Sequence, residues 1–166
     1  MTAPSIRPAV EADLPAILAI HNHAVLHGTA LWTSVPSDLA GRRAVLAERA
    51  AKGYPFLVVE LDGGVAGYGS FGDFRPHDGY GRTVEHSLYI DPDRQGRGLG
   101  GLLLGRLVAL AGEAGKHVIV GGIAADNPAS LALHRRHGFI ETGRLPEVGF
   151  KFGRALDLVF MQRILA

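Results

Sequence analysis

The sequence predicts an α/β fold with a mixed, mostly antiparallel central sheet flanked by about four helices. Three observations indicate this class. Strand-like and helix-like runs follow one another in the order βααβββαβαβ(β). The turn Asp62-Gly63-Gly64 separates two strand-like runs and predicts an antiparallel hairpin. The all-apolar run 118–123 follows a helix-like run, which is typical of a buried strand that pairs in parallel across that helix.

The first half of the chain supplies the N-terminal elements of this order. Residues 6–10 form a predicted short strand near a sheet edge, because Pro8 has no N–H to donate. Asp13 is expected to cap a first helix, and Gly53 to end a second one. The apolar stripe of the first helix is Leu14, Ile17, Leu18 and Val25. The other ranges predicted here are a helix over 39–51 and strands over 56–61, 65–71 and 83–90.

The second half is predicted to alternate helices with strands. A helix from Leu102 to Ala114 has leucines at helical spacing on one face, as expected for docking on a sheet. The loop 72–82 carries charged and aromatic side chains beside the sheet, where recognition usually occurs. The remaining predicted elements are the strand 118–123, a helix over 129–137, and strands over 139–142 and 157–162.

Composition narrows the class of protein. The chain has 166 residues, and residues 1–166 are expected to form one domain. A net charge of +1 gives no basic field for nucleic acid, and the absence of cysteine excludes disulfides and a cysteine nucleophile. The N-terminus has no apolar signal core, and no apolar run approaches the length of a membrane span, so a cytoplasmic protein is expected. The histidines match no metal-ligand spacing, so no metal is expected.

A glycine-rich segment, residues 91–101, lies between the strand 83–90 and the next helix. Such a loop leaves backbone N–H groups unpaired at a helix start, and the helix dipole adds positive potential there. The glycines allow close approach of a bulky group, and Arg94 and Arg97 are expected to add charge at the rim. The segment therefore predicts an anion site, with phosphate as the usual anion.

Three interpretations of this loop stay open on its residues alone. Gly96-x-Gly98-x-x-Gly101 satisfies a dinucleotide-binding pattern, although the glycines do not directly follow the strand and Asp126 falls late for a ribose contact. Gln95-x-x-Gly98-x-Gly100 resembles the Q/R-x-x-G-x-G/A signature of the GNAT acyltransferases, in which the loop holds the pyrophosphate of acetyl-CoA. A flexible glycine loop without a ligand is the third.

Further motifs in the same order make the chain resemble the GNAT acyltransferases. Gln95-x-x-Gly98-x-Gly100 is followed by Asn127-x-x-Ser130 and by Leu133-His134-x-x-x-Gly138-Phe139. More narrowly, the segments 72–75, 83–90 and 151–154 resemble the phosphinothricin and methionine sulfoximine N-acetyltransferases, and the similarity extends from Ile6 to Met161. The chain departs from that pattern at Phe74 and Ala155, where tryptophan is expected, and at His77.

The resemblance implies a GNAT fold and transfer of acetyl from acetyl-CoA to the α-amine of a small amino-acid analogue. Phosphinothricin, methionine sulfoximine and methionine sulfone are the acceptors implied. Because the chain has no cysteine, direct attack in a ternary complex is the simpler route. The resemblance also implies a homodimer. The residues implied to bind acetyl-CoA are Leu88, Tyr89, Ile90, Gln95, Gly96, Arg97, Gly98, Leu99, Gly100, Gly101 and Asn127.

Two residues are candidates for proton transfer. Glu85 is the candidate base, through a water, because burial beside an apolar strand raises a carboxyl pKa toward the working range. A salt-bridged strand glutamate is the alternative. His134 lies where many GNAT enzymes carry the tyrosine that protonates the leaving thiolate, and the alternative is a histidine on a helix surface. Asn127 is similarly either a coenzyme contact or a turn cap.

Arg75 is the candidate for binding a substrate carboxylate, because guanidinium and carboxylate form a two-point fork. The alternative is a solvated loop arginine. Tyr80 is a further candidate wall of the pocket. The residues expected to line the substrate pocket are Trp32, Phe74, Arg75, Pro76, His77, Glu85, His86 and Ser87.

Two other functions stay open beside the small amino-acid analogue. The same fold could acetylate a polyamine, an aminoglycoside or a protein N-terminus, none of which needs a carboxylate clamp. A non-catalytic acyl-CoA sensor would bind the coenzyme without an acceptor.

Overall fold

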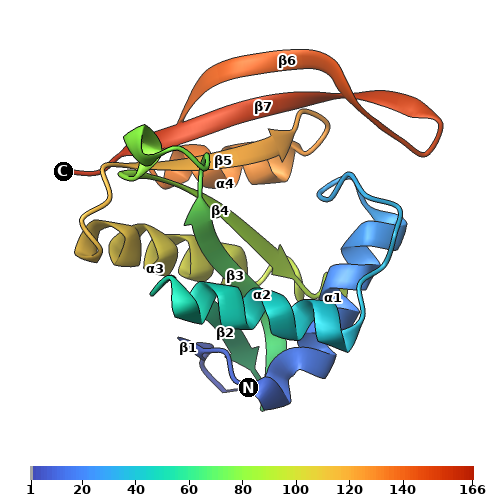
Figure 1. Cartoon of the computed structure of the whole chain (residues 1–166). Coiled ribbons are helices and arrows are strands. Elements are labelled where there is room, and N and C mark those ends of the chain that lie inside the picture. Colours follow the sequence, from blue (N-terminus) through green and yellow to red (C-terminus); the bar gives the residue numbers. More distant parts are fainter. Residues whose placement is uncertain (1) are drawn as a thin grey trace.

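The computed structural model describes residues 2–166 and shows a mixed seven-stranded sheet with the strand order β1-β2-β3-β4-β5-β7-β6 (Figure 1). Every neighbouring pair is antiparallel except β4 and β5, which are parallel. The predicted α/β class is confirmed. The elements are β1 (Ser5–Pro8), α1 (Leu14–His27), α2 (Leu39–Ala51), β2 (Phe56–Leu61), β3 (Gly64–Asp73), β4 (Thr83–Ile90), α3 (Leu99–Glu113), β5 (Val118–Ala124), α4 (Pro128–Arg136), β6 (Ile140–Lys151) and β7 (Arg154–Ile164).

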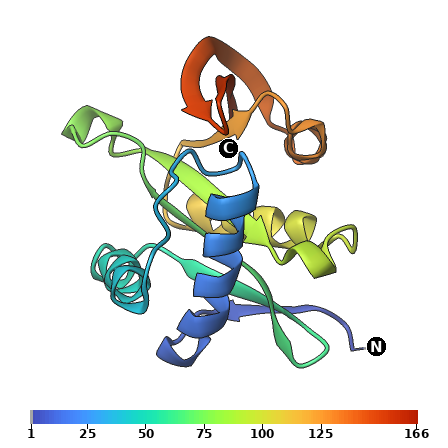
Figure 2. The same ribbon diagram turned by 90° about the vertical axis from the view of Figure 1, so that its right-hand side faces the viewer.

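Helices cover both faces of the sheet, and Figure 2 shows α2 and α3 on opposite sides of it. The larger apolar core lies between the sheet and α3, where Leu103, Leu104 and Leu107 are fully buried. A smaller core on the other face packs Leu14 and Ile17 of α1 against the sheet. Because side chains alternate along a strand, each central strand contributes to both cores. None of the helices within residues 2–166 combines the length and apolarity that a bilayer crossing requires.

The strands β4 and β5 pair only over a short stretch and then separate. Their register runs from Thr83↔Val118 to Glu85↔Val120, although both strands continue beyond it. In Figure 1 the two strands start close together and diverge toward their ends. The sheet is therefore split at this point, and the β5-facing backbone edge of β4 beyond Glu85 has no strand partner. This opening positions the candidate site.

Several predicted boundaries match the structure and others do not. The helix over 39–51 and the strands over 56–61 and 83–90 coincide with α2, β2 and β4. The helix expected to start at Leu102 starts at Leu99, because Gly98 at φ 77° forms its N-terminal cap. Asp13 precedes α1, but its carboxylate binds Arg7 and the Val10 N–H rather than the first turn of α1.

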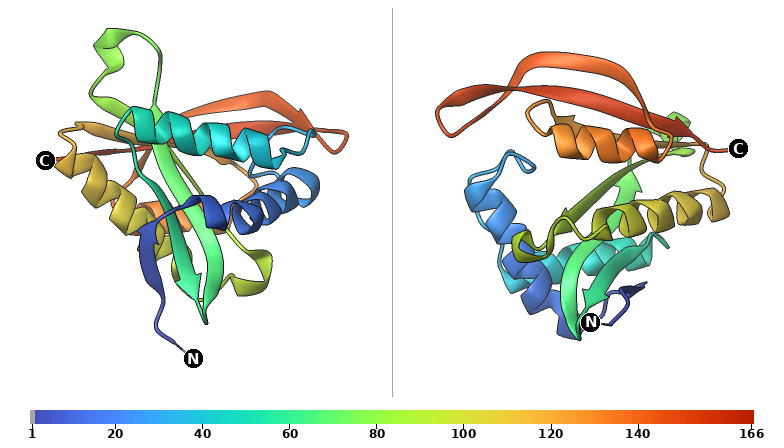
Figure 3. Two further views of the ribbon diagram at one scale, coloured as in Figure 1. Left: turned by 60° about the horizontal axis from the view of Figure 1, so that its bottom comes forward. Right: turned by 180° about the vertical axis from the view of Figure 1, so that it is seen from behind.

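The predicted and observed strand boundaries differ most in the C-terminal hairpin, which β6 and β7 form. The sequence predicts short strands over 139–142 and 157–162, whereas β6 extends to Lys151 and β7 begins at Arg154. Most of β6 is exposed, and its register on β7 shifts twice, so it lacks the alternating apolar pattern that identifies a half-buried strand. The hairpin tip reaches the loop after α1, as both panels of Figure 3 show.

Candidate active site

Two adjoining cavities occupy the opening between β4 and β5. The outer cavity, about 570 Å³, faces α2, and the inner cavity, about 100 Å³, faces α4. Both are lined by His86, Ser87, Tyr89 and Gly122, so one short segment of β4 separates them. The other residues of the outer cavity are Glu48, Arg49, Lys52, Gly72, Asp73, Phe74, Arg75, Pro76 and Glu85. Those of the inner cavity are Ala30, Leu88, Ile123, Ala124, Asn127, Ser130 and His134.

Glu85 lies at the last residue of β4 that pairs with β5. Its carboxyl is half-buried, and a Cβ at Gly122 would lie only 3.3 Å from Oε1, so the glycine makes room for it. Burial raises the pKa of Glu85, and the positive charge of Arg75 opposes this rise. The carboxyl makes no ion pair within 4.0 Å in the described chain. The alternative interpretation of Glu85 as a salt-bridged glutamate is therefore not supported. A carboxyl group with a raised pKa suits a general base.

Arg75 lies on the wall of the outer cavity, in the loop after β3. Its guanidinium is 4.2 Å from the centre of the Phe74 ring, and Nη1 donates to the Phe74 carbonyl at 2.8 Å. The described residues offer it no carboxylate within ion-pair distance. Phe74 and Pro76 line the same cavity. The charge of Arg75 is thus available for an anionic group in the cavity.

Two residues expected in the substrate pocket lie elsewhere. His77 is exposed at the start of a short 3-10 turn, Asp78–Tyr80. Trp32 packs its ring against Gly149 of β6 and donates Nε1–H to the Thr29 carbonyl at 2.8 Å. Neither residue lines the outer or the inner cavity. Tyr80 lines a separate cavity of about 310 Å³ together with Phe74 and residues of β5 and β7.

His86 and His134 form a buried pair on the inner side of β4. Their Nε2 atoms are 3.1 Å apart and their rings stack at 5.0 Å. Nδ1 of His134 lies 2.7 Å from the Ser130 carbonyl, which can only accept, so that nitrogen carries the proton. Nε2 of His134 then accepts from His86. Burial lowers the pKa of His134 and brings that of His86 to about 3.

The geometry of this pair limits how His134, the predicted proton donor, could act. Both nitrogens of His134 are engaged, and the ring is buried rather than on a helix surface. Nδ1 of His86 is buried without a partner among residues 2–166. A Cβ at Gly121 would lie 2.8 Å from Nε2 of His86, so a glycine is required beside the pair. The role of His134 as an acid stays a prediction.

The free edge of β4 runs along the inner cavity. Leu88 and Tyr89 line this cavity, and the Ile90 carbonyl accepts only a long 3.5 Å bond from the Gln95 side chain. Asn127 also lines it, while its Oδ1 accepts from the Ser130 N–H at 3.1 Å and caps α4. Both interpretations of Asn127 are thus compatible with its position. The unpaired backbone of β4 can hydrogen-bond an extended ligand like an added strand.

The glycine loop forms the start of α3 as predicted. Gly96 and Gly98 have φ values of 74° and 77°, in the left-handed region that favours glycine. The first N–H groups of α3 have no acceptor within the helix, which gives an anion site. Arg97 is half-exposed nearby, at 3.9 Å from Asp62. The expectation for Arg94 was wrong: its guanidinium donates to carbonyls of the β2–β3 hairpin, at 2.7 Å for Leu61, and holds that hairpin instead.

Sequence reasoning missed three contributions to the site. Arg49 reaches the outer cavity from α2, and because it is one of three arginines of this helix, no pattern distinguished it. Gly121 and Gly122 make room for the histidine pair and for Glu85. Two adjacent glycines inside an apolar strand were the signal that could have found them, because such glycines mark close approach.

A buried lysine holds the loop that covers the inner cavity. Nζ of Lys151, in β6, lies 2.6 Å from each of the carbonyl oxygens of Gly28 and Leu31. Between these two residues, Ala30 lines the inner cavity. The hairpin tip therefore fixes one wall of the site, which sequence reasoning also missed.

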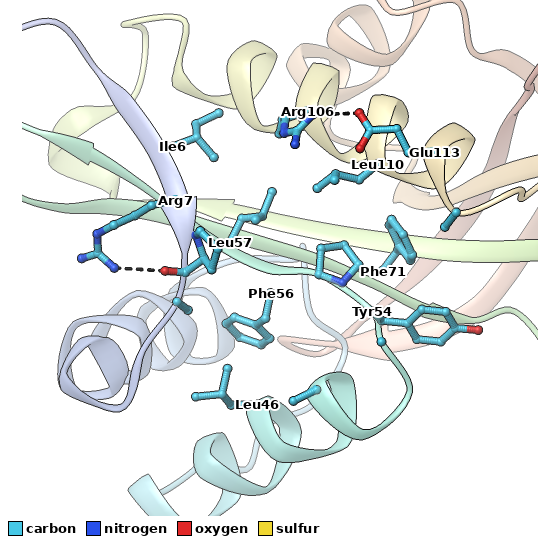
Figure 4. Close-up of a pocket in the computed structure, with 16 residues that line it drawn as sticks. Ile6, Arg7, Leu46, Tyr54, Phe56, Leu57, Phe71, Arg106, Leu110 and Glu113 are labelled. Atoms are coloured by element: carbon cyan, nitrogen blue, oxygen red, sulfur yellow. Dashed lines mark hydrogen bonds and ion pairs between the residues drawn. The ribbon is translucent and has the colours of Figure 1, made fainter.

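A further cavity of about 630 Å³ lies elsewhere, between β1, α2 and α3 (Figure 4). Figure 4 shows mainly apolar side chains in it, among them Phe56 and Leu110. Its charged groups are already paired, Arg106 with Glu113 at 3.1 Å and Arg7 with Asp13. Chemistry rather than volume therefore favours the cavities at β4.

Comparison with known families identifies the class. The model of the acetyltransferase (GNAT) family matches residues 19–139, and the chain belongs to this family. It is 53% identical over 158 residues to the L-amino acid N-acyltransferase MnaT of Escherichia coli, covering 95% of this chain and 92% of that protein. It is also 53% identical over 159 residues to the L-methionine sulfoximine/L-methionine sulfone acetyltransferase of Pseudomonas aeruginosa, with the same coverage of 95% and 92%.

A solved structure extends the comparison to the coenzyme. The GNAT superfamily phosphinothricin acetyltransferase of Sinorhizobium meliloti, in complex with acetyl-CoA, superposes with a TM-score of 0.96 at 36% identity. The match covers 99% of this chain and 90% of that one. The resemblance to GNAT N-acetyltransferases and the enzyme class are therefore confirmed, and the dinucleotide and empty-loop interpretations are not needed.

Proposed function

We propose that this N-acetyltransferase transfers acetyl from acetyl-CoA to the α-amino group of a small amino-acid analogue such as methionine sulfoximine, methionine sulfone or phosphinothricin. The meeting of two cavities at β4 is the observation that supports this most. The outer one combines a carboxyl of raised pKa, Glu85, with the unpaired guanidinium of Arg75. The name of the Pseudomonas aeruginosa relative supports the two methionine derivatives, and that of the Sinorhizobium meliloti structure supports phosphinothricin.

The coenzyme is proposed to enter from the α3–α4 side. Its diphosphate would bind the N–H groups at the start of α3, between Gln95 and Gly101. Its pantetheine arm would then follow the free edge of β4 from Ile90 toward Leu88, with Asn127 opposite. The thioester would lie in the inner cavity, where a β4 N–H can donate to the carbonyl oxygen. One such preorganised donor lowers the barrier by about 2.7–4 kcal/mol.

The acceptor is proposed to bind in the outer cavity. Arg75 would hold the α-carboxylate by its two-point fork, and the ammonium would then face Glu85. Glu85 removes a proton through a water, and the neutral amine attacks the thioester carbonyl carbon. The new C–N bond forms, the C–S bond breaks as the tetrahedral oxyanion collapses, and the nitrogen loses its second proton, which balances the proton that the leaving thiolate gains.

The leaving thiolate needs a proton, and His134 is the predicted donor. Its Nδ1–H points at the Ser130 carbonyl and its Nε2 at His86. The ring must therefore exchange one of these contacts for the sulfur before it can donate. Ser130 and His134 both line the inner cavity, so this exchange would occur where the thioester is proposed to lie.

Thiol release on mixing acetyl-CoA with a panel of amines tests the function. Turnover is expected with methionine sulfoximine, methionine sulfone and phosphinothricin, and not with a polyamine, an aminoglycoside or a peptide N-terminus. Turnover only on amines without a carboxylate would overturn the acceptor class. Coenzyme binding without turnover on any amine would favour a sensor.

We also propose a homodimer of one-domain subunits. The edge strand β6 is twelve residues long and exposes Val148 and Phe150, with Phe152 in the turn after it. A long apolar edge strand is a template for pairing with another chain. Sedimentation of the wild type is expected to give a dimer, and Phe150→Lys to lower the dimer fraction. A wild-type monomer at micromolar concentration would contradict this.

A further inference from the structure

A second guanidinium, that of Arg49, lies on the wall of the outer cavity. It comes from the C-terminal half of α2, whereas Arg75 comes from the loop after β3. Nε of Arg49 donates to Ser70 Oγ at 3.0 Å, and Ser70 in turn donates to the Pro55 carbonyl at 2.7 Å. The arginine is thus anchored at its inner end, and its side chain is 22% exposed.

The outer end of Arg49 is only partly committed. Nη1 lies 3.1 Å from Glu48, a carboxylate that also pairs with Lys52 at 3.3 Å. Within residues 2–166, Nη2 has no hydrogen-bond partner. Lys52 is the third cation of this cavity, but Asp73 at 2.7 Å and Glu48 already neutralise it. Arg49 and Arg75 are therefore the two guanidinium groups of this cavity, and both retain free N–H donors.

Gly72 determines where the guanidinium of Arg49 lies. A Cβ at Gly72 would be 2.9 Å from Cζ and 3.0 Å from Nη2, so the guanidinium covers the position that a side chain would occupy. Gly72 is also the register partner of Glu85. Residues directly opposite in antiparallel strands share one face of the sheet. Arg49 thus presents its donors on the same face as the candidate base.

We infer that Arg49 binds the side-chain end of the acceptor and selects acceptors that carry oxygen atoms there. This inference rests on the proposed function, in which Arg75 already takes the α-carboxylate. An acceptor without strong hydrogen-bond acceptor atoms at its side-chain end would leave the donors of Arg49 unpaired in the cavity, which is costly. Sulfone, sulfoximine and phosphinate groups each carry oxygen on a tetrahedral sulfur or phosphorus atom, whereas a thioether sulfur is only a weak hydrogen-bond acceptor.

Methionine and methionine sulfone test this inference, because they differ only in the two oxygens on sulfur. In Arg49→Met, kcat/KM for the sulfone is expected to fall by about 10- to 100-fold, the size of a lost hydrogen bond to a charged group. The value for methionine is expected to change little, so the sulfone/methionine ratio collapses. Arg49→Lys keeps the charge without the fork and is expected to retain part of the ratio.

Three companion variants separate recognition from folding. Gly72→Ala retains Arg49 and displaces its guanidinium, so the ratio is expected to fall again. Arg75→Ala removes a contact that both acceptors share, so both rates fall and the ratio stays. Arg43→Gln is the control, since Arg43 lies on the same helix but pairs with Glu11 at 2.5 Å, outside the cavity. Melting temperatures show whether each variant is folded.

The outcomes distinguish this inference from the proposed function. If the wild type acetylates neither acceptor, the proposed function fails first. If the wild type prefers the sulfone and Arg49→Met keeps that preference, Arg49 does not read the side-chain oxygens and the inference is overturned. Equal losses on both acceptors in folded Arg49→Met and Gly72→Ala would likewise overturn it, because they would show a role in shaping the cavity.

Discussion

The two faces of β4 carry different chemistry within two consecutive residues. Glu85 faces the outer cavity beside charged side chains, whereas His86 is buried on the other face against His134. Burial acts on both groups by disfavouring their charged forms, so it raises the pKa of the acid and lowers the pKa of the imidazole. One strand thus carries the candidate base on one face and the neutral histidine pair on the other, at the point where β4 separates from β5.

The largest expected effect comes from removing the outer group. Glu85→Gln keeps the shape of the side chain and abolishes its basicity, so kcat is expected to fall by about 10²- to 10⁴-fold. Acetyl-CoA binding is expected to be unchanged in calorimetry, because the coenzyme is proposed to lie on the other face. The control is Glu113→Gln, an exposed carboxylate on α3 that pairs with Arg106. A Glu85→Gln enzyme with wild-type kcat would remove Glu85 from the chemistry.

Two adjacent glycines allow each face to be disturbed separately. A Cβ in Gly121→Ala would lie 2.8 Å from His86 Nε2 and 3.2 Å from His134 Nε2, so the histidine pair must separate. We expect kcat to fall by up to about 10²-fold through misplacement, at an overpacking cost of about 1–3 kcal/mol in unfolding free energy.

The matched variant is Gly122→Ala, whose Cβ would meet Glu85 Oε1 at 3.3 Å instead. Gly122→Ala is expected to change the pH dependence of kcat/KM. Gly121→Ala is expected to leave that pH dependence unchanged. If both variants behave alike in pH profiles and in single-turnover rates, the two faces are not chemically separate.

The buried imidazole makes a smaller contribution, to stability in acid. The pKa of His86 falls from 6.5 to about 3 on folding, so its stabilising effect is complete above pH 6.5 and is lost as the pH falls toward 3. At pH 5 this loss is about 2 kcal/mol of unfolding free energy. The raised pKa of Glu85 acts with the opposite sign, because its neutral form is favoured at low pH.

Urea unfolding of the wild type and His86→Phe at pH 7 and pH 5 measures this contribution. The wild type is expected to lose more stability between the two pH values than the variant. His27→Gln, at an exposed histidine, is the control and is expected to follow the wild type. Equal losses in the wild type and His86→Phe would show that His86 does not resist protonation.

The same two faces show which parts of the site were predictable from sequence. The bounds of β4, the glycine loop and Glu85 follow from local pattern, because strand alternation and a glycine-rich helix start act over a few residues. The histidine pair joins residues 48 positions apart, and no local signal fixes that contact. Arg49 over Gly72 likewise depends on how α2 packs on β3.

The C-terminal hairpin shows a second limit. The length of β6 depends on its pairing with β7 and not on its own apolar pattern, so local pattern predicts only its first residues as a strand. The loop position of Trp32 follows from the sequence. Its packing against Gly149 does not, because it depends on the position of the hairpin tip. Contacts between segments far apart in the chain thus determine the walls of the site, while local pattern determines β4 and the glycine loop.

The smallest expected effect tests the link between Arg75 and Glu85. Arg75 lowers the pKa of Glu85, so Arg75→Ala is expected to raise that pKa further and to move the acid limb of kcat/KM to higher pH. Arg82→Ala, at an exposed arginine of the same loop, is the control and is expected to leave the limb in place. KM for the amino-acid acceptor reports separately on the carboxylate fork. A shifted limb with an unchanged KM would make Arg75 an electrostatic neighbour of the base rather than a ligand of the substrate. A raised KM with an unshifted limb would assign it to the substrate alone.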